Sequence, residues 1–323
     1  MKSPSNLSCK ICQNQTSNQI IKVREMYFGT RDEFEYLECA NCGCLQLLNP
    51  PKDFTKYYPK NYFTYQQKFE SKFKSFLNRF RDKSAMDQKS FLGDLLLKTF
   101  GAPTYIKRLK IIDIKMNDKI LDVGCGKGIL LHKMKESGFK YVLGIDPFID
   151  ETIIYKNGLK ILKENFFDLN EKFDLIMFNH SFEHMENPLE VLQHSNYLLN
   201  EKKYLLVRIP VADSVAFFKY RENWSSLDAP RHLFLYTKKS IQYLANLSGF
   251  KIIRTDYDSR SWQFWGSEQY SRDIPLLAEN SYYITTSKSI FSKKEIDKFE
   301  EQTKILNGKG EGDQAEFYLQ KIN

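Results

Sequence analysis

Lys119-Ile-Leu-Asp-Val-Gly-Cys-Gly-Lys-Gly128 is the stretch of this sequence that decides the fold. Its apolar beginning predicts a strand over about 119–124, and a helix is predicted over about 128–137. The three glycines between them let the backbone turn sharply and come close to a ligand. The free amides at the start of the helix are available to that ligand. The segment therefore predicts a ligand-binding turn between a strand and a helix.

From Lys119 onward, strand-like runs alternate with helical patterns. Such alternation is typical of βαβ units around a parallel sheet, so the fold class is α/β. The sequence predicts strands at about 119–124, 141–145, 159–163, 173–178 and 203–209, and helices at about 128–137, 150–157 and 187–200. After these come a helix near 238–248, a strand near 250–257, a polar helix near 292–306 and a strand within 316–322.

The spacing of the glycines narrows the kind of ligand. Dinucleotide folds use GxGxxG, whereas this turn reads GxGxG, which argues against a pyrophosphate grip. The run resembles motif I of class I methyltransferases, which bind S-adenosylmethionine (SAM), and the resemblance implies a Rossmann-like, seven-stranded sheet. It assigns cofactor contacts to Asp122, Gly124, Cys125, Gly126 and Gly128. Cys125 is interpreted as a small packing residue and not as a nucleophile.

Two further positions fit a bound nucleoside. Asp146 follows the next predicted strand, about 20 residues beyond the turn, where its carboxylate can accept both ribose hydroxyls, and Pro147 comes directly after it. Methyltransferases usually have an Asp after the following strand to bind the adenine amino group. This sequence has Asn165, whose amide oxygen can still accept that hydrogen bond, and Phe166 could pack on adenine.

The segment 172–188 is similar to the methyltransferase run FDxIxxxxxxEHxxxP. It covers a strand and the loop at its carboxyl end, where ligands of such sheets bind. The resemblance therefore puts Asn179, His180, Glu183 and His184 near the methyl group. The letters HxxEH also match a zinc protease signature, but that site needs a continuous helix, whereas a strand ends here and Pro188 closes the loop.

Five of the six cysteines lie in the first 44 residues. Two CxxC pairs can surround Zn²⁺ tetrahedrally with four thiolates, and such a closed site is structural because it has no open position. We expect the ligands to be Cys9, Cys12, Cys39 and Cys42, with Cys44 as the alternative to Cys42.

The composition divides the chain into three parts. We predict a zinc-binding module over 1–52, a Tyr-rich and helical linker over 53–116, and a SAM-dependent methyltransferase domain with acceptor-binding insertions over 117–323. In the linker, Phe69, Phe73, Phe76 and Phe80 form a helical stripe. We interpret the stripe as core packing on the next domain, and a basic amphipathic helix resting on a membrane surface is the alternative.

Charge and hydropathy set limits on the partners. The net charge of +8 fits a phosphate-bearing partner, although solvated lysines spread along the chain give the same value. No apolar run approaches the roughly 20 residues that span a bilayer, and the first residues lack the apolar segment of a secretory signal. We therefore expect a cytoplasmic protein without a transmembrane segment.

The regions outside the SAM motifs suggest the acceptor. The paired CxxC motifs, the Tyr-rich stretch and a histidine before an aromatic-rich strand resemble the methyltransferases of surface-glycan and deoxysugar pathways. In sugar C-methyltransferases a YHEH-type motif supplies the catalytic histidine, and here the stretch reads Ala229-Pro-Arg-His232. The resemblance implies a nucleotide-sugar or glycan acceptor, methylated on oxygen or carbon. His232 is the expected general base, with Glu183 or His184 as fallback and Arg231 as an anchor for acceptor phosphate.

Two other functions are compatible with these motifs. A zinc ribbon together with positive charge also occurs in rRNA and tRNA methyltransferases. Residues 32–38 of the module are acidic, however, and no basic stripe interleaves with its aromatic residues, which argues against nucleic acid. A catalytically silent SAM-binding scaffold is the second alternative.

Overall fold

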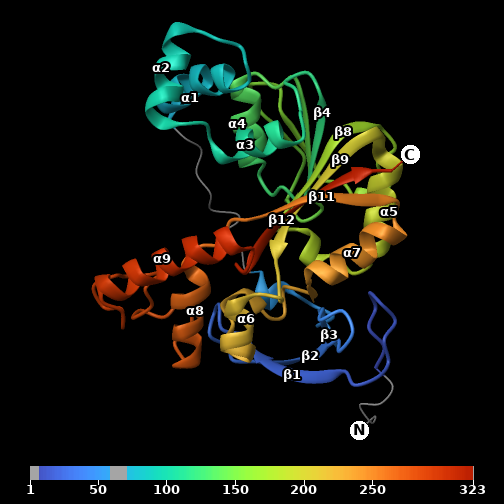
Figure 1. Ribbon diagram of the computed structural model, residues 1–323, viewed down its shortest axis with the longest axis vertical. Coiled ribbons are helices and arrows are strands. Elements are labelled where there is room, and N and C mark those ends of the chain that lie inside the picture. Colours follow the sequence, from blue (N-terminus) through green and yellow to red (C-terminus); the bar gives the residue numbers. More distant parts are fainter. Residues whose placement is uncertain (1–6, 59–70, 323) are drawn as a thin grey trace.

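A computed structural model of the chain describes residues 7–58 and 71–322 (Figure 1). Its centre is an eight-stranded sheet with the order β11-β12-β9-β8-β4-β5-β7-β6. The inner strands β7, β5, β4, β8 and β9 are parallel, whereas β6, β12 and β11 each pair antiparallel with their neighbours. The strands are β4 (Lys119–Val123), β5 (Tyr141–Ile145), β6 (Ile153–Ile154), β7 (Lys160–Leu162), β8 (Phe173–Asn179), β9 (Leu199–Pro210), β11 (Phe250–Tyr257) and β12 (Gln314–Lys321). The predicted Rossmann-like sheet is confirmed, with β6 as an eighth, edge strand.

The central strands are buried on both faces because their apolar side chains point alternately to two separate cores. Leu121, Ile176 and Leu205 lie in one hydrophobic cluster. Their neighbours Ile120, Leu175 and Leu206 lie in the cluster on the opposite face. This alternation is the period of two that a strand imposes on its side chains. It explains why these segments are continuous apolar runs in the sequence.

Helices cover both faces of this sheet. They are α3 (Thr104–Ile111), α4 (Ile129–Ser137), α5 (Pro188–Leu198) and α7 (Lys238–Leu247). The helix predicted over about 150–157 is wrong. Gly158 takes a positive φ of 80° and turns the chain, so that Ile153 and Ile154 pair antiparallel with β7 as the edge strand β6.

The N-terminal segment forms a second sheet of four strands, with the order β1-β2-β3-β10. Its strands are β1 (Gln19–Arg24), β2 (Glu33–Glu38), β3 (Leu45–Leu47) and β10 (Phe234–Leu235). The strands β1 and β2 form an antiparallel hairpin. Because β10 comes from far along the chain, the cysteine-rich module shares its sheet with the region around His232. The boundary near residue 52 stays a prediction.

Three further helices surround this small sheet or extend beside it (Figure 1). They are α6 (Val215–Tyr220), α8 (Trp262–Ser271) and α9 (Lys293–Lys309). The rings of Phe264 on α8 and Phe299 on α9 stack with centroids 5.7 Å apart. Much of the chain after Pro210 therefore joins the N-terminal segment in the second half of the molecule, while β11 and β12 return to the large sheet.

The linker contains a short 3-10 turn (Thr55–Tyr57) and the helices α1 (Lys72–Ala85) and α2 (Phe91–Phe100). Phe69 and most of the Tyr-rich stretch lie outside the described residues. The core-packing prediction is wrong for Phe73 and Phe76, which are both exposed. Polar contacts hold α1 instead, because the Asp82 carboxylate accepts hydrogen bonds from Tyr105 and Ser137. Within the described ranges, no helix has both the length and the apolar character needed to cross a bilayer.

Candidate active site

The glycine-rich turn between β4 and α4 has the backbone that its sequence requires. Gly124, Gly126 and Gly128 have φ angles of 71°, 55° and 70°. A Cβ atom on Gly124 would lie 2.5 Å from the Cβ of Ser181, so only glycine fits there. The turn therefore packs directly against the loop that follows β8.

Asp146 is fixed at the carboxyl end of β5, next to this turn. Its Oδ2 accepts a hydrogen bond of 2.8 Å from the Gly126 amide, and its Oδ1 accepts one of 2.9 Å from the Phe148 amide. Each carboxylate oxygen keeps a second lone pair. The carboxylate is therefore oriented in advance and can accept the two hydroxyls of a ribose.

Asp122 lies buried at the end of β4, and Asn179 lies at the end of the neighbouring strand β8. The Asn179 amide donates a hydrogen bond of 3.1 Å to the Asp122 carboxyl group. Burial raises the pKa of Asp122 to about 7, and this effect outweighs the hydrogen bond from Asn179. The structure thus brings together two residues that the motifs predict near the cofactor.

The predicted adenine contacts are less well placed. The Asn165 side chain is exposed, and its oxygen accepts a hydrogen bond of 3.0 Å from the Phe167 amide. Phe166 is buried against the rings of Phe178 and His194, so the structure does not support its packing on adenine. Phe148, two residues after Asp146, is 80% exposed and offers an open ring beside the ribose position.

Glu183 is the centre of the loop after β8. Its side chain is fully buried, and its Oε1 lies 3.4 Å from Nδ1 of His180. Burial raises the pKa of Glu183, but His180, His184 and His232 together outweigh it and lower this pKa to about 2. A charged carboxylate is therefore enclosed by three imidazoles.

The hydrogen bonds of two of these imidazoles define their tautomers. Nδ1 of His184 lies 2.7 Å from the Arg231 carbonyl oxygen, and Nδ1 of His232 lies 2.9 Å from the Ser226 carbonyl oxygen. A carbonyl can only accept, so both Nδ1 atoms carry the hydrogen. In a neutral ring, Nε2 then holds a free lone pair. Burial lowers the pKa of His184, which favours its neutral form.

His232 is the better placed of the two to take a proton. Its Nε2 lies 3.9 Å from Oε1 of Glu183 and 3.9 Å from Oδ2 of Asp228. Two carboxylates thus lie close to the atom that would accept a proton. The geometry therefore suits a general base.

Arg231 does not have the role predicted for it. Its guanidinium is fully buried, donates to Asp228 over 2.6 Å and 2.9 Å, and lies 3.2 Å from Glu25. The rings of Tyr27 and Phe28 lie against the guanidinium. The expectation that Arg231 anchors an acceptor phosphate is wrong, because the side chain is committed to two carboxylates inside the protein. It positions the segment that carries His232.

The four cysteines predicted as zinc ligands lie together. The Sγ atoms of Cys9 and Cys42 are 3.6 Å apart, those of Cys12 and Cys39 are 3.4 Å apart, and all four lie within 4.8 Å of one another. None of them is in a disulfide. Thiolates bound tetrahedrally at about 2.3 Å from zinc would be about 3.8 Å apart. The cluster therefore fits Zn²⁺, and Cys44 lies outside it.

Glu183, His184 and His232 are a second group with ligand atoms within 4.8 Å of one another. The two free Nε2 lone pairs and the carboxylate could also hold a divalent cation. The same three side chains are the predicted catalytic residues.

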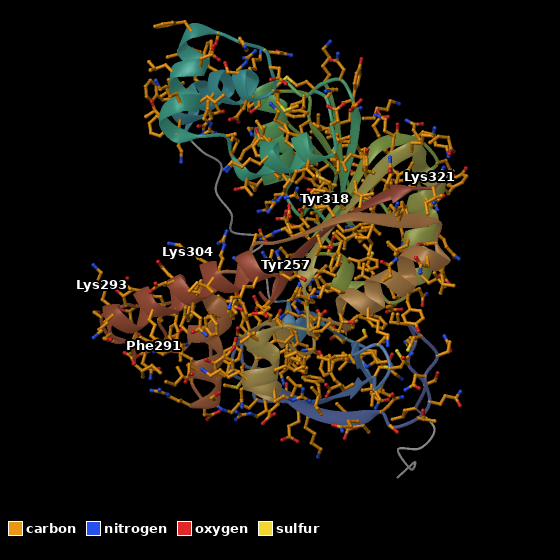
Figure 2. The ribbon with its side chains drawn as sticks, in the orientation of Figure 1. Tyr257, Phe291, Lys293, Lys304, Tyr318 and Lys321 are labelled. Carbon is orange, nitrogen blue, oxygen red and sulfur yellow. The ribbon has the colours of Figure 1, made fainter. Side chains whose placement is uncertain are left out.

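A polar cleft of about 550 Å³ opens between α3, β11, β12 and α9, and none of the predicted site residues lines it. Figure 2 labels Tyr257 and Tyr318, which line it from the two strands. Arg108 on α3 forms salt bridges with Glu316 and, over 2.8 Å, with Asp258. Arg208 on β9 forms salt bridges with the same two carboxylates. Arg208 also donates to Nε2 of His180, so the wall of the cleft is connected to Glu183 through one imidazole.

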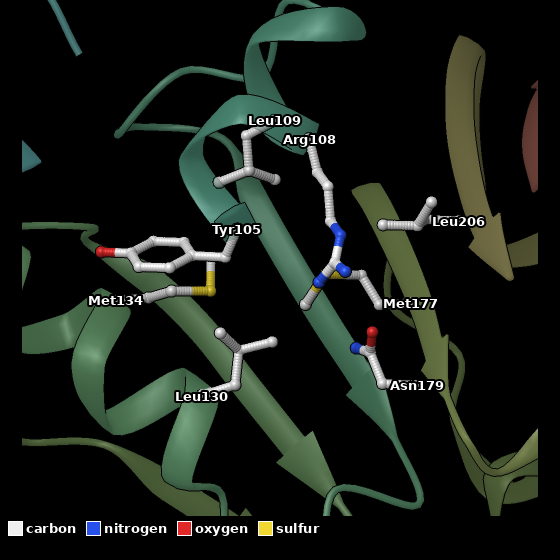
Figure 3. Close-up of a pocket in the computed structure, with 8 residues that line it drawn as sticks. All are labelled: Tyr105, Arg108, Leu109, Leu130, Met134, Met177, Asn179 and Leu206. Carbon is white, nitrogen blue, oxygen red and sulfur yellow. The ribbon is translucent and has the colours of Figure 1, made fainter. Parts of the chain in front are cut away.

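A second, much smaller space lies on the other side of Arg108, between α3 and the large sheet. In Figure 3 the Arg108 side chain extends from α3 toward Met177 and Asn179 of β8. The remaining space there is only about 10 Å³, which is close to the volume that one water molecule requires. The cleft beside β11 and β12, and not this void, is large enough for a ligand.

Known proteins match this chain over the same region. The methyltransferase domain family matches residues 67–255. The chain belongs to this family. Two curated relatives are named ubiquinone biosynthesis O-methyltransferase. The protein of Glaesserella parasuis is 34% identical over 119 residues, which cover 31% of this chain and 50% of the relative. The protein of Haemophilus ducreyi is 37% identical over 111 residues, which cover 28% of this chain and 47% of the relative. The chain thus spans about half the length of the curated relatives it matches.

Solved structures that resemble this chain include a SAM-dependent methyltransferase from Archaeoglobus fulgidus, with 19% identity, a TM-score of 0.41, and 70% of this chain and 98% of that one covered. A cyclopropane synthase from Mycobacterium tuberculosis has 16% identity and a TM-score of 0.43, with 76% and 94% covered. Both scores are below 0.5, so the assignment rests on the family match. The motif I turn and Asp146 of this methyltransferase domain fit SAM as the cofactor.

Four residues of the centre did not stand out in the sequence. Tyr58 lies 3.4 Å from Nδ1 of His184, Arg208 contacts His180, Asp228 faces His232, and Phe148 lies beside Asp146. Only Phe148 had a usable signal, as a large apolar residue just after the ribose-binding carboxylate. The other three are brought to the centre by tertiary folding.

Proposed function

We propose that this methyltransferase transfers the methyl group of SAM to a sugar, on oxygen or carbon, within a nucleotide-linked or glycan acceptor. The observation that carries the proposal is the position of His232. Its free Nε2 lies between two carboxylates, on the segment that corresponds to the catalytic stretch of sugar methyltransferases. A sugar hydroxyl or an acidic C–H must lose a proton during transfer, which requires such a base.

SAM supplies an electrophilic methyl group on a sulfonium, and the chain has residues to hold the rest of that molecule. Asp146 would accept the ribose hydroxyls, and Gly124 and Gly126 would let the backbone approach the nucleoside. Phe148 would cover one face of the adenine. The residues thus orient the acceptor and donor for an in-line displacement.

The proton follows a short path in this proposal. His232 takes it from the acceptor at Nε2, while Nδ1 stays bonded to the Ser226 carbonyl. Glu183 and Asp228 stabilise the imidazolium. Despite burial, the surrounding imidazoles lower the pKa of Glu183, and the Arg231 guanidinium lowers that of Asp228. His184 holds the loop through the Arg231 carbonyl and is the second candidate for the base.

The polar cleft between α3 and α9 supports a phosphorylated or hydroxylated acceptor. Lys107 and Lys309 lie on its rim and are exposed, while Asn307 and Thr104 add hydrogen-bonding groups. Lysine is a common phosphate ligand. In this proposal Lys107 and Lys309, and not Arg231, bind the acceptor phosphate.

The cysteine cluster completes the proposal with one structural Zn²⁺ per chain. Thr237 donates a hydrogen bond to the Cys42 carbonyl, and β10 completes the sheet beside the cluster. A metal there would stabilise the surroundings of His232 without touching the substrates, since four thiolates leave no open position.

The test is mass spectrometry of SAM turnover against a panel of nucleotide-sugars, with RNA and a simple phenol as competing acceptors. The expected result is a methylated nucleotide-sugar that is absent when Asp146→Ala is used. Methylation of RNA with a steep salt dependence would favour the nucleic-acid alternative. Methylation of the phenol alone would point to the reaction in the relatives' names.

A further inference from the structure

The helices α1 and α2 form a hairpin, residues 71–100, whose apolar side chains face solvent. Phe73, Phe91 and Phe100 are 75%, 90% and 70% exposed, and Phe76, Leu92 and Leu95 are exposed as well. Four of the seven exposed phenylalanines among the described residues lie in this hairpin. Large contiguous apolar surface on a protein usually marks a contact with a partner or a membrane.

The packing of the two helices explains why these side chains point outward. A Cβ atom on Gly93 would lie 2.2 Å from Oγ of Ser84 and 2.5 Å from the Phe80 carbonyl oxygen. The helices therefore cross closely through small residues. At 3.6 residues per turn, Phe91 and Leu95 lie on the face of α2 roughly opposite Gly93. The face of α2 that contacts α1 therefore needs few large apolar side chains, and the opposite face of α2 carries Phe91 and Leu95.

The charge around this apolar face is positive. Residues 71–100 contain seven Lys and Arg and three Asp, which gives 7 − 3 = +4. Asp82 is buried and bonded to Tyr105 and Ser137, so only Asp87 and Asp94 present exposed negative charge. The exposed Lys89 and Lys98 flank the apolar residues of α2. Apolar side chains set among basic ones are complementary to an anionic, apolar surface.

The hairpin also has a suitable place in the molecule. In Figure 1 it lies at the outer end of the α/β domain, on the far side from the four-stranded sheet. Asp82 joins α1 to α3 and α4, through Tyr105 and Ser137, and Lys110 bonds the Ala85 carbonyl. The inner helix is thus attached rigidly, while α2 remains open to a large flat partner.

We propose that this hairpin docks the enzyme on an anionic phospholipid surface. Phe91, Leu92 and Leu95, which share one face of α2, enter the boundary between headgroups and acyl chains, and the lysines contact lipid phosphates. The contact is peripheral and reversible. It is independent of the acceptor, so it holds whether or not the proposed sugar is methylated.

Flotation of the full chain with vesicles tests this. Vesicles of phosphatidylcholine with 30% phosphatidylglycerol, about a natural anionic fraction, are compared with pure phosphatidylcholine at low and high salt. We expect binding to the anionic vesicles that high salt weakens strongly. Phe91→Ser with Leu95→Ser should reduce the partition coefficient about 100-fold, from the apolar area lost. Lys89→Glu with Lys98→Glu should reduce it about 30-fold or more, at about 1 kcal/mol per basic residue.

Matched variants on the other half of the molecule are the controls. Phe218→Ser on α6 removes an equally exposed ring, and Lys293→Glu with Lys294→Glu reverses two exposed lysines on α9. Both should bind vesicles like the unaltered protein, and circular dichroism should show every variant folded. Equal binding of the α2 variants and controls would overturn the proposal. So would the absence of vesicle binding, together with a concentration-dependent dimer that Phe91→Ser abolishes, because a second copy would then cover the face.

Discussion

Nε2 of His232 lies 3.9 Å from Oε1 of Glu183, although the two residues are 49 positions apart in the sequence. The distance is too long for a direct hydrogen bond but short enough for a strong charge interaction inside the protein. Glu183 is fully buried, and neither of its oxygens has a hydrogen bond within the described chain. We interpret Glu183 as the positioning residue that stabilises protonated His232.

Glu183→Gln therefore keeps the shape and removes the charge. We expect kcat to fall about 10- to 100-fold, while SAM affinity and KM for the acceptor change little, because the charge matters only once the proton has moved. Steady-state kinetics and calorimetry measure both quantities. Glu183→Asp, which retains a carboxylate, should restore part of the rate, and a Gln variant with unaltered kcat would contradict the role.

Asp146 gives a test of the SAM site that needs no acceptor. Asp146→Ala removes both ribose contacts and should weaken SAM binding by about 3 to 6 kcal/mol, since each of the two charge-assisted hydrogen bonds contributes roughly 1.5 to 3. Isothermal calorimetry measures the loss. The control is Asp297→Ala, an exposed carboxylate on α9. Equal affinities in the two variants would rule out Asp146 as the ribose ligand.

Asp122 makes the stability of the protein without SAM depend on pH. Burial raises the pKa of Asp122 to about 7 from an ordinary value of 3.8, so the folded protein holds this proton more tightly than the unfolded chain. The resulting stabilisation is complete below about pH 4 and is lost as the pH rises to about 7. Asp122→Asn, which can still accept from Asn179, should flatten this dependence.

Chemical denaturation between pH 4 and pH 8 measures the effect. At pH 8 the Asn variant should be more stable than the unaltered protein by about 1 to 3 kcal/mol, because it buries no charge. Asp297→Asn should follow the unaltered protein throughout. A curve for Asp122→Asn that is parallel to the original would show that Asp122 titrates normally.

The zinc proposal predicts one metal ion per chain in protein purified without chelator. Cys12→Ser should lose the ion and make the N-terminal module sensitive to protease, because metal binding supplies part of the folding free energy. Cys44→Ala is the control, since its Sγ bonds the Leu45 carbonyl outside the cluster and zinc should remain. Elemental analysis decides, and metal-free protein with an intact module would refute the assignment.

Local signals in the sequence were sufficient for most of the large sheet. The turn at Gly124 and the carboxylate of Asp146 can be recognised from their spacing in the sequence. Each depends only on the connection that directly follows its own strand. The helix prediction for 150–157 failed because a short apolar run is compatible with both a helix and a strand. The turn at Gly158 makes Ile153 and Ile154 a strand.

The centre around Glu183 was only partly predictable for a different reason. Its histidines were identified by their positions near strand ends, but their tautomers depend on carbonyls of Arg231 and Ser226. Arg231 was misread, because nothing local reveals that Glu25, 206 residues away, pairs with it. The exposed phenylalanines of α1 were misread because periodicity shows that a stripe exists, not what it contacts.

The most direct test of the account is the rate of methyl transfer by His232→Ala beside His184→Ala, with the acceptor that the panel identifies. The account predicts that His232→Ala lowers kcat about 100-fold or more and leaves SAM affinity nearly unchanged, as expected for a lost general base. His184→Ala should retain more activity. Normal turnover by His232→Ala with an inactive His184→Ala would contradict the account and assign the base to the loop after β8.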